Sequence, residues 1–522
     1  MPAVVTDQFR IFNANNFIDS LFDASNSYYV FLGLSNPIQT TPSFGRATND
    51  NWPTDPIDNF QFLSHYRDTS LFGKKIVPSN VRRVVKRNDW VQNTKYDMYR
   101  HDYSASNKSP NSQSTNLYGS NYYVVNSDLQ VYVCIDNGSS GAPNSANANG
   151  GNSLDEPKFS DPSPSAAGTS GDGYIWKYLF QIAPSDIIKF DSTEFIALPN
   201  DWPTSTDSQI QIVREAGDSR INNNQIKKVY IENSGSSASA VYTQGSHTCP
   251  ILGDGTGGEV NVTVDSNGKV EDVVVTSGGQ GYTYGIIDLT TAQINSNAPI
   301  DLENRAKLIP IIPPSRGHGF DLYLELGADK VLIYTRFDDS TLSFPTSTKF
   351  SQVGILKNPE RFSDSTIFDG INFSSSFSMK LSANPTTIPE VGTIIFQDVA
   401  KGYVTSYNRQ TQVLKYSRDR SLFFNSETPT NQTDYVGISS ASKIEEFALG
   451  SDVEPLGVSI EDFNSSTVSV NNKVIGLGVT FSGGLANPEI NKQTGDIIYI
   501  DNRALVARDA RQKEDIKIIL EF

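Results

Sequence analysis

The chain has few of the residues from which metal centres and nucleophilic active sites are usually built. Its 522 residues include the following histidines and cysteines: His65, His101, His247, His318, Cys134 and Cys249. They are scattered, so no zinc-ligand spacing occurs, and neither a Gly-x-Ser-x-Gly elbow nor a His-Glu-x-x-His motif is present. We therefore expect no metal, no cofactor and no enzymatic activity. For two cysteines so far apart in the sequence, two buried thiols are the commoner arrangement. A disulfide between Cys134 and Cys249 is the alternative that the sequence does not decide.

Long apolar runs and positive charge are also scarce. No window approaches the roughly 20 apolar residues of a membrane span, and the N-terminal stretch has neither the basic start nor the apolar segment of a signal peptide. The 42 Lys and Arg are outnumbered by 58 Asp and Glu, which gives a net charge of -16. Because domains that follow a nucleic-acid backbone are normally basic, we expect no nucleic-acid partner. We also expect no membrane partner, no small-molecule substrate, and a chain made in a cytoplasm.

Aromatic and turn-forming residues are abundant. The chain contains 23 Tyr, 28 Phe, 38 Gly and 26 Pro, while only 19% of its residues are charged. Aromatic and β-branched side chains suit a pleated, half-buried surface, and Gly, Pro, Asn and Asp supply turn geometry. The composition therefore predicts short strands joined by many turns, in a mostly β fold with a few short helices.

Local patterns place the main elements along the chain. Apolar residues at helical spacing predict a helix within 13–27, and the sequence YYVFLGL at 28–34 is typical of a strand buried on both faces. Residues 122–135 alternate around a polar turn, which predicts a hairpin. Residues 136–173 have too little apolar surface to compensate for the conformational entropy that the segment would lose on becoming ordered. We therefore expect a long surface loop, partly mobile. The apolar end of the chain, 514–522, is expected to join an existing sheet.

Changes in composition predict two inserted regions. Residues 223–300 combine Val- and Ile-rich strands with Gly and Ser turns, as in a small inserted β module. Residues 363–490 are rich in Ser, Asn and Thr with short strands, and are expected to form a second inserted β region. The remaining segments, 1–222, 301–362 and 491–522, are predicted to form one core.

The stretch GDGTGG at 253–258 has the glycine density of a phosphate loop. A phosphate loop, however, needs a Lys followed by Ser or Thr and then a helix, whereas a strand pattern, EVNVTV, follows here. A calcium-binding repeat would need tandem copies, and one copy is present. Tight-turn chemistry is the favoured interpretation.

Acidic pairs for sugar cleavage are conceivable at Asp321 with Glu325 and at Asp338 with Asp339. Glycoside hydrolysis needs two carboxyl groups about 5 to 10 Å apart across a groove. Spacing along the chain does not establish that geometry, so these residues are weak candidates.

The segment GDGYIWKYLF at 171–180 carries the aromatic residues Tyr174, Trp176 and Tyr178. Such rings stack on sugars or bases in binding proteins. Here they alternate with Ile175 and Leu179, so both faces carry large side chains, which is typical of a strand between two layers. We therefore expect a core strand that follows the loop ending at Gly173, with Trp176 its most buried residue.

The basic residues Arg82, Arg83, Lys86 and Arg87 share a short segment with apolar valines. An acidic partner could dock on them, and we note them as a candidate partner interface. A solvated strand face that protects a sheet edge is the commoner explanation of such a cluster.

An ordered series of motifs resembles the homodimeric baseplate wedge subunit, of the gene-product-eight type, of large contractile-tailed bacteriophages (myoviruses). The series covers about 10–205, 345–362 and 491–522 of this chain. Its motifs are YYVFLGLSNP, PTDPIDN, KKIVPSNVRRVVKRNDW, VYVCIDN, EP, GDGYIWKYLFQI, FIALP, KFSQVGILKNP, GDIIYIDNRALVARD and EDIKIILEF. Within them, Trp90, Pro359 and Tyr499, like the residues around Trp176, are expected to belong to the scaffold.

The resemblance implies a layered β-sandwich with helices in loops and no catalysis. It implies a homodimer in each baseplate wedge that binds other wedge proteins and helps rearrange the plate on contraction, in a virion assembled in the host cytoplasm. The chain departs from the pattern in its extra material at about 223–300 and 363–490. Two alternatives from other classes are a virion-surface glycan-binding or glycan-depolymerising protein and a trimeric receptor-binding fibre.

Overall fold

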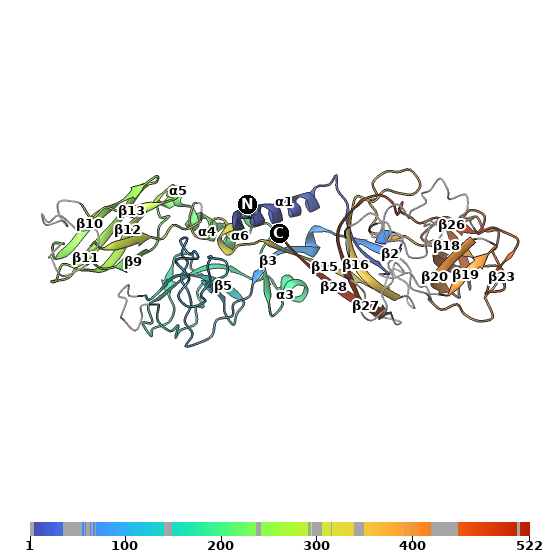
Figure 1. Cartoon of the computed structure of the whole chain (residues 1–522), viewed down its shortest axis with the longest axis horizontal. Coiled ribbons are helices and arrows are strands. Elements are labelled where there is room, and N and C mark those ends of the chain that lie inside the picture. Colours follow the sequence, from blue (N-terminus) through green and yellow to red (C-terminus); the bar gives the residue numbers. More distant parts are fainter. Residues whose placement is uncertain are drawn as a thin grey trace. The chain divides into compact units, whose positions relative to one another are not determined.

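The structure is a computed structural model of the chain (Figure 1). It describes residues 5–34, 55–56, 58, 63, 66–67, 69–139, 149–235, 242–290, 294, 305–314, 316–338, 349–391, 393–398, 400–418, 447–508 and 512–522. This part is mostly β, with a few short helices and several antiparallel sheets, which confirms the predicted fold class. None of its helices is long and apolar enough to cross a membrane. His65 and most of the motif at 53–59 lie outside the described residues.

The chain divides into two compact units. Unit 1 consists of Met1–Asn16, Arg82–Leu332 and Ile519–Phe522, and unit 2 of Phe17–Val81 and Ile333–Ile518. The segments that we expected to form one core therefore contribute to both units.

A four-stranded antiparallel sheet organises the main core of unit 1. Its order is β4-β5-β7-β6, with β4 at Tyr123–Val125, β5 at Gln130–Asn137, β7 at Tyr174–Gln181 and β6 at Ser165–Ala166. Strands β4 and β5 form the predicted hairpin. Strand β5 also pairs with β7 and places Cys134 opposite Trp176. Both side chains are fully buried, because tyrosines and valines from the same strands surround them.

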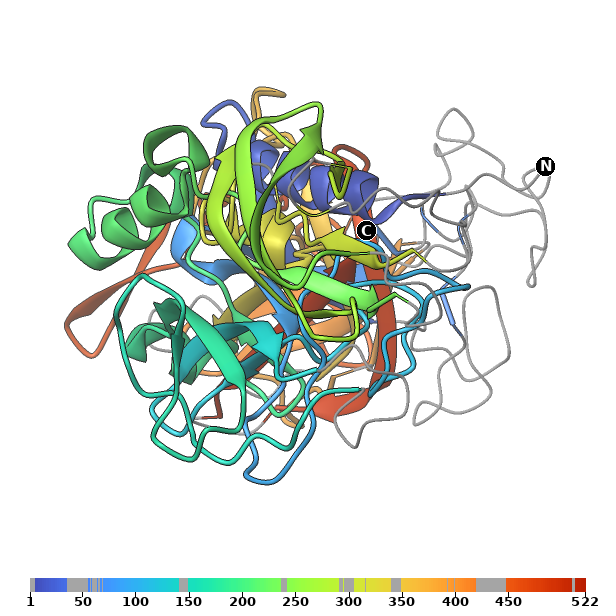
Figure 2. The ribbon, with the colours of Figure 1, turned by 90° about the vertical axis from the view of Figure 1, so that its left-hand side faces the viewer.

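The segment predicted as an inserted module has a hydrophobic core of its own. Its larger sheet has the order β12-β11-β10-β13 and appears in Figure 2 as a curved yellow-green layer nearest the viewer. The bounds are Val270–Gln280 for β12, Thr256–Val264 for β11, Gly245–Gly253 for β10 and Gly285–Ile287 for β13. A second pair joins β14, Lys307–Pro310, to β9, Val229–Asn233. The inward positions of β11 are the valines Val260, Val262 and Val264, as period-two alternation requires.

The glycine-rich stretch 253–258 covers the end of β10, the turn at 254–255 and the start of β11. Asp254 accepts a hydrogen bond from the backbone N–H of Thr283 at 2.9 Å and from the Thr283 hydroxyl at 2.5 Å. The turn interpretation is thereby confirmed, and the aspartate serves to tie two turns of the module together.

Unit 1 contains short helices, of which α4, α5 and α6 begin at aspartate caps. Their bounds are Pro184–Phe190 for α3, Ser208–Gly217 for α4, Ser219–Asn222 for α5 and Leu322–Leu326 for α6. The Asp207 carboxylate accepts from the backbone N–H groups of Gln209 and Ile210 at the start of α4. The Asp321 carboxylate accepts from the Leu324 N–H at the start of α6. These bonds satisfy N–H groups that the first turn of a helix leaves without partners.

The first helix, α1, spans Asp7–Phe22, so it begins and ends earlier than the predicted range 13–27. Its buried residues Ile11, Ala14, Ile18 and Leu21 follow helical spacing. The helix stops before residue 27 because the Asp23 carboxylate accepts a hydrogen bond from the Ser25 N–H at 2.9 Å, which closes a polar turn.

A further sheet has the order β28-β15-β3-β8. The bounds are Glu514–Glu521 for β28, Lys330–Phe337 for β15, Val81–Lys86 for β3 and Phe195–Ala197 for β8. The apolar C-terminal segment thus joins a sheet as an edge strand, beside β15. Its side chains alternate in burial, as on a strand with one covered face.

Unit 2 contains a five-stranded sheet in the order β17-β2-β1-β16-β27. The bounds are Asn372–Ser374 for β17, Ser70–Lys75 for β2, Tyr28–Gly33 for β1, Lys349–Lys357 for β16 and Asp496–Ala507 for β27. All six residues of β1 are buried, because this strand has neighbours on both sides and cover on both faces. The predicted buried strand is confirmed.

The second region predicted as an insert also has its own hydrophobic cluster within unit 2. Its main sheet has the order β19-β20-β21-β18-β26, with β19 at Ile394–Gln397, β20 at Ala400–Asn408, β21 at Val413–Arg418, β18 at Phe377–Lys380 and β26 at Leu485–Ala486. Two strand pairs accompany it: β22 (Asp452–Val453) with β23 (Val458–Ser459), and β24 (Thr467–Val470) with β25 (Lys473–Gly476).

The polar segment 136–173 is partly ordered by its own carboxylates. The Asp172 carboxylate accepts from the Leu154 N–H, and the Asp155 carboxylate accepts from the Ser170 N–H, both at 2.8 Å. Residues 140–148, where part of the predicted mobile loop falls, lie outside the described residues. Gly173 closes the segment at φ 85°, and a Cβ there would come within 2.8 Å of the Gly138 backbone, so only glycine fits.

Candidate functional site

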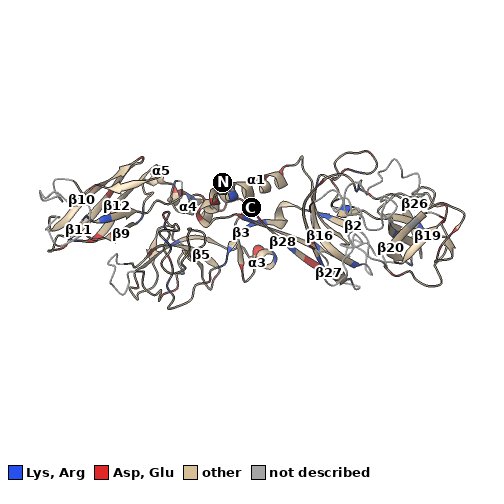
Figure 3. Cartoon of the chain, in the orientation of Figure 1, with Lys and Arg blue, Asp and Glu red and all other residues tan. Residues whose placement is uncertain are grey.

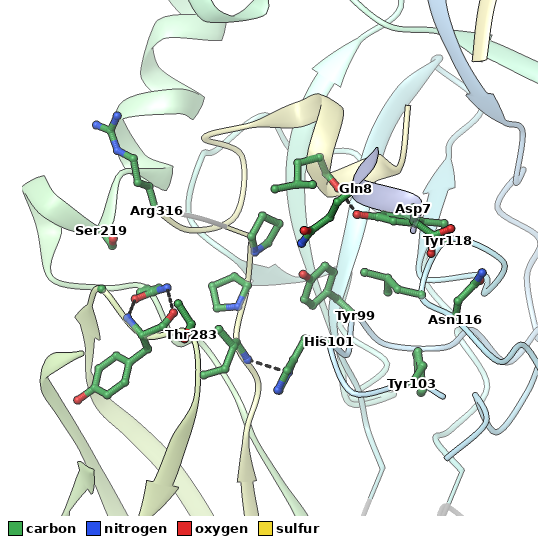
Figure 4. A pocket seen from close by; sticks show the side chains of 18 of the residues that line it. Asp7, Gln8, Tyr99, His101, Tyr103, Asn116, Tyr118, Ser219, Thr283 and Arg316 are labelled. Carbon is green, nitrogen blue, oxygen red and sulfur yellow. Dashed lines mark hydrogen bonds between the residues drawn. The ribbon is translucent and has the colours of Figure 1, made fainter. Parts of the chain in front are cut away.

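Unit 1 contains a cavity of about 690 Å³ (Figure 4). It is lined by the beginning of α1, by segments 99–103 and 116–118, by α5 and neighbouring parts of the inserted module, and by segment 312–316. The module and the main core of unit 1 therefore share one concave surface. No sequence motif joins these segments, since they come together only through folding.

Tyrosine rings form one wall of the cavity. Tyr99 is edge-on to His318, with ring centroids 4.7 Å apart. The Tyr103 hydroxyl donates to the Met98 carbonyl at 3.0 Å, and the Tyr118 hydroxyl donates to the Leu324 carbonyl at 2.7 Å. Burial raises the pKa of all three phenols, so they stay neutral. The hydroxyls of Tyr103 and Tyr118 are bound to the backbone, and these rings offer mainly their apolar surfaces.

His101 supplies a neutral hydrogen-bonding group. Its Nδ1 accepts a hydrogen bond from the Ile312 N–H at 3.1 Å. Burial lowers the pKa of His101, with smaller opposed effects from Asp102 and Arg100. Because Nδ1 acts as an acceptor, the proton of the neutral ring is assigned to Nε2. The ring is therefore a hydrogen-bond donor through Nε2.

The opposite wall is fixed by the pair Gln225 and Tyr282. The Gln225 amide donates to the Tyr282 carbonyl and accepts from the Tyr282 N–H, both at 2.8 Å. The Tyr282 hydroxyl in turn donates to the Ile251 carbonyl at 2.8 Å. These bonds hold the turn after β12 against the segment that leads into the module, so this wall is preorganised.

The charged residues of the lining are Asp7, Arg220 and Arg316, and the two arginines lie beside Asp218. The Asp218 carboxylate accepts hydrogen bonds from the Arg316 guanidinium and the Arg220 N–H. Burial acts to raise the pKa of Asp218, but these bonds and the two cations outweigh it, so this pKa is lowered. The Arg316 guanidinium also stacks on Phe320 at 3.6 Å, and Figure 4 shows it turned away from Tyr99 and His101. The Arg316 guanidinium is therefore engaged by Asp218 and Phe320 and does not point into the cavity.

The cavity combines hydrogen-bonding groups and apolar ring surfaces with the charged side chains of Asp7, Arg220 and Arg316. Within the described ranges, no cluster of three or more His, Cys, Asp or Glu could hold a metal ion. The acidic candidates Asp321 and Glu325 have structural tasks, since Asp321 caps α6 and Glu325 is fully buried against His318. Asp339 lies outside the described residues.

The basic candidates are engaged inside unit 1. Arg82 makes two hydrogen bonds to the Asp186 carboxylate, at 2.8 and 2.9 Å, and Arg87 binds Asp191 at 2.7 Å. Arg83 is 4% exposed, donates to Asn15 and lies over the Tyr323 ring. Lys86 is the exposed member of the cluster. The three arginines are held by internal contacts, and the candidate partner interface at Arg82, Arg83, Lys86 and Arg87 stays a prediction.

The residues expected to belong to the scaffold occupy different depths. Tyr174 and Trp176 are fully buried and stack on each other, and Tyr178 is 3% exposed. Pro359 is buried and Tyr499 on β27 is half-buried. Trp90 is also half-buried, and its indole N–H donates to the Ser153 hydroxyl at 3.0 Å.

Sequence reasoning missed the buried pair of His318 and Glu325 and the cavity residue His101. His318 and Glu325 stand seven positions apart, but no motif marks either one as buried. For His101 no spacing pattern marks the residue. Its neighbour Arg100 is 6% exposed and lies over the Tyr230 ring.

Comparison with known proteins gives one informative similarity. No family model matches the chain. The chain is similar to the baseplate wedge protein gp8 of Enterobacteria phage T4, with 26% identity over 221 residues. The match covers 38% of this chain and 61% of that protein, so the chain spans less than two thirds of the length of the curated relative it matches.

Proposed function

We propose that the chain is a non-enzymatic structural subunit of a phage tail baseplate wedge. In this role it forms a homodimer and links neighbouring wedge proteins during baseplate assembly and contraction. The similarity to the phage T4 protein carries the proposal. Two further features support it: a mostly β architecture with separate hydrophobic cores, and carboxylates that serve as caps and internal partners.

Cryo-electron microscopy of intact tails tests the location. The expected result is density for unit 1 and unit 2 within the baseplate, in contact with other wedge proteins. Density confined to a fibre or absent from the tail would contradict the proposal. Light scattering on the purified chain tests the homodimer separately, because a strict monomer or a trimer at micromolar concentration excludes it.

Glycan binding is a second candidate function, favoured by the chemistry of the cavity alone. Neutral donors and acceptors beside tyrosine rings suit sugar hydroxyls and ring faces. The exposed polar residues Gln8 and Asn116 line the cavity and do not belong to the core (Figure 4).

Titration with host polysaccharide, followed by saturation-transfer NMR, tests glycan binding. Under this second function, Gln8→Ala with Asn116→Ala weakens the signal, while Lys86→Ala leaves it unchanged. Release of reducing sugar would instead indicate a depolymerase and contradict the non-enzymatic proposal.

A further inference from the structure

The chain contains three Asn–Gly pairs, at 137–138, 149–150 and 267–268. Asparagine is one of the chemically labile side chains of proteins. When glycine follows it, the glycine backbone nitrogen can approach the asparagine side-chain carbonyl carbon, Cγ, because glycine has no Cβ to obstruct the approach. The three pairs are equivalent in this respect. Any difference in their reactivity in the native chain must therefore come from the structure around them.

The first pair is held by hydrogen bonds on every side. Asn137, the last residue of β5, is 1% exposed. Its Nδ2 donates to the Tyr96 carbonyl at 3.0 Å, and its Oδ1 accepts from the Ser139 N–H at 3.3 Å. The Gly138 N–H, whose nitrogen would have to attack, donates to the Asp136 carboxylate at 3.0 Å. Buried groups lose these bonds without gaining bonds to water, so a reaction at Asn137 requires local unfolding.

The third pair lies on an exposed turn of the inserted module, but hydrogen bonds close this turn. The Asp265 carboxylate accepts from the Asn267 N–H at 2.8 Å and from the Asn267 side-chain amide at 3.2 Å. The Gly268 N–H donates to the Asp265 carbonyl at 3.1 Å. Asn267 is therefore accessible to water, while both of the groups that would react are engaged.

The second pair is exposed and unrestrained. Within the described ranges, the Asn149 side-chain amide has no hydrogen-bond partner, and the residue is held through its backbone carbonyl, which accepts from the Asn111 side chain at 3.1 Å. In the same part of the chain the Gly150 N–H has no hydrogen-bond partner either. Gly150 has φ 92°, and a Cβ there would come within 2.5 Å of Asn137 Nδ2, so the position requires glycine.

We infer that Asn149 is a site of spontaneous deamidation in the native chain. The Gly150 nitrogen loses its proton to water and forms a bond to Asn149 Cγ. The bond between Cγ and Nδ2 breaks, and the nitrogen takes a proton from water and leaves as ammonia. Water then opens the cyclic succinimide at either carbonyl, which gives aspartate or isoaspartate. Water is the co-reactant, and nothing is oxidised or reduced. The inference does not depend on the proposed baseplate role.

The product differs from the original chain in charge and in backbone geometry. It adds a carboxylate to a chain with 58 acidic and 42 basic residues, which Figure 3 shows scattered among many elements. The isoaspartate form also lengthens the backbone by a methylene group close to Gly151. The Gly151 N–H donates to the Asn137 carbonyl at 2.9 Å, and its carbonyl accepts from the Tyr174 hydroxyl at 2.8 Å. The change therefore falls where the polar segment 136–173 contacts β5 and β7.

Peptide mass spectrometry of the full chain, incubated at neutral pH and physiological temperature, tests the inference. In the native protein Asn149 should deamidate at least about 10-fold faster than Asn267, and Asn137 should be the slowest, because only the first reacts without breaking hydrogen bonds or opening the fold. In urea the three rates should become similar. Asn149→Gln should remove this modification, because glutamine must close a larger ring. The matched control Asn267→Gln should leave the rate at Asn149 unchanged.

Several results would overturn the inference. Equal native rates at Asn149 and Asn267 would show that the hydrogen bonds of the turn at 265–268 do not protect. A chain that reacts at Asn149 in urea but not in the native state would show that the fold protects this site as well. Ion-exchange chromatography separates the modified chain by its added negative charge, with Asn149→Asp as the reference for the aspartate product. Because the isolated chain is measured, failure of the baseplate role leaves this result unaffected.

Discussion

Glu325 and His318 form a buried pair in unit 1, with Glu325 Oε1 2.6 Å from His318 Nδ1. Their side chains are 0% and 3% exposed, respectively. The second carboxylate oxygen of Glu325 accepts from the Gly319 N–H at 2.5 Å, so one side chain holds the turn 318–319 against α6. Tyr99 lies edge-on to the same histidine and links this pair to the wall of the cavity.

Replacing Glu325 by Ala should lower the free energy of unfolding by about 3 to 5 kcal/mol. The variant leaves His318 and the Gly319 N–H buried without their partner, which is the costly way to break such a pair. Urea denaturation followed by tyrosine and tryptophan fluorescence measures the loss. Glu325→Gln, which keeps an acceptor, should cost less than half as much. Equal losses for both variants would show that the hydrogen bonds contribute little.

Trp176→Ala should also cost about 3 to 5 kcal/mol, because a fully buried large side chain leaves a cavity that the surrounding strands cannot fill. Among the described residues its indole N–H has no hydrogen-bond partner, so packing accounts for the loss. Trp90→Ala, at a half-buried position, is the matched comparison and should cost less. Any loss of partner binding should follow the loss of folding. A Trp176→Ala protein that is fully folded yet fails to bind one partner would contradict the core assignment.

Lys177 should make stability rise with pH in the alkaline range. Burial lowers the pKa of Lys177 from 10.5 to about 8, so the unfolded chain binds more protons than the folded chain between these values. The free-energy cost of burying the charged Lys177 side chain is fully present below pH 8. This cost is relieved as the pH rises toward 10.5, the pKa of Lys177 in the unfolded chain. From pH 7 to 9.5 the relief is about 2 kcal/mol.

The variant Lys177→Met isolates this contribution. Urea unfolding of the wild type and the variant, measured at intervals from pH 7 to 9.5, should give curves that converge as the pH rises. Their difference is informative because other titrating groups, including the buried tyrosines, contribute equally to both proteins. Parallel curves would mean that Lys177 stays charged in the folded state, held by its hydrogen bond to the Pro162 carbonyl.

The arginines of β3 should matter for stability and Lys86 should not. Arg82→Ala removes two charge-assisted hydrogen bonds to Asp186 and should cost about 2 kcal/mol. Lys86→Ala, the exposed comparison four residues away, should change stability by less than about 0.5 kcal/mol. Thermal unfolding of both variants provides the test. A larger loss of stability for Lys86→Ala than for Arg82→Ala would show that the ion pair between Arg82 and Asp186 contributes little.

The two cysteines should behave as unreactive free thiols. Cys134 and Cys249 are both buried, and burial raises the pKa of the Cys134 thiol, which disfavours the reactive thiolate. A thiol reagent added without reductant should label neither residue in the native chain and both after denaturation. Intact mass spectrometry counts the labels. A denatured chain that takes up none would instead contain a disulfide.

The sequence by itself determined the local elements and the fold class. The continuous apolar run of β1, the alternating hairpin of β4 and β5, and the turn at 253–258 are recognisable because their causes lie within a few neighbouring residues. In the same way, helix α1 was recognised from its periodicity, although its ends depended on the polar turn at Asp23.

Tertiary structure decided everything that depends on distant partners. Arg82 and Asp186 are 104 positions apart, and only folding turns a basic cluster into internal ion pairs. The cavity draws on the start of α1, on segments 99–118 and on the inserted module, which share no sequence signal. Phe9 and Phe12 resemble core residues in the sequence, and only the packed side of α1 shows that they face solvent. Periodicity reports which residues share a face, but the elements packed against a face decide whether it is buried, paired or left exposed to solvent.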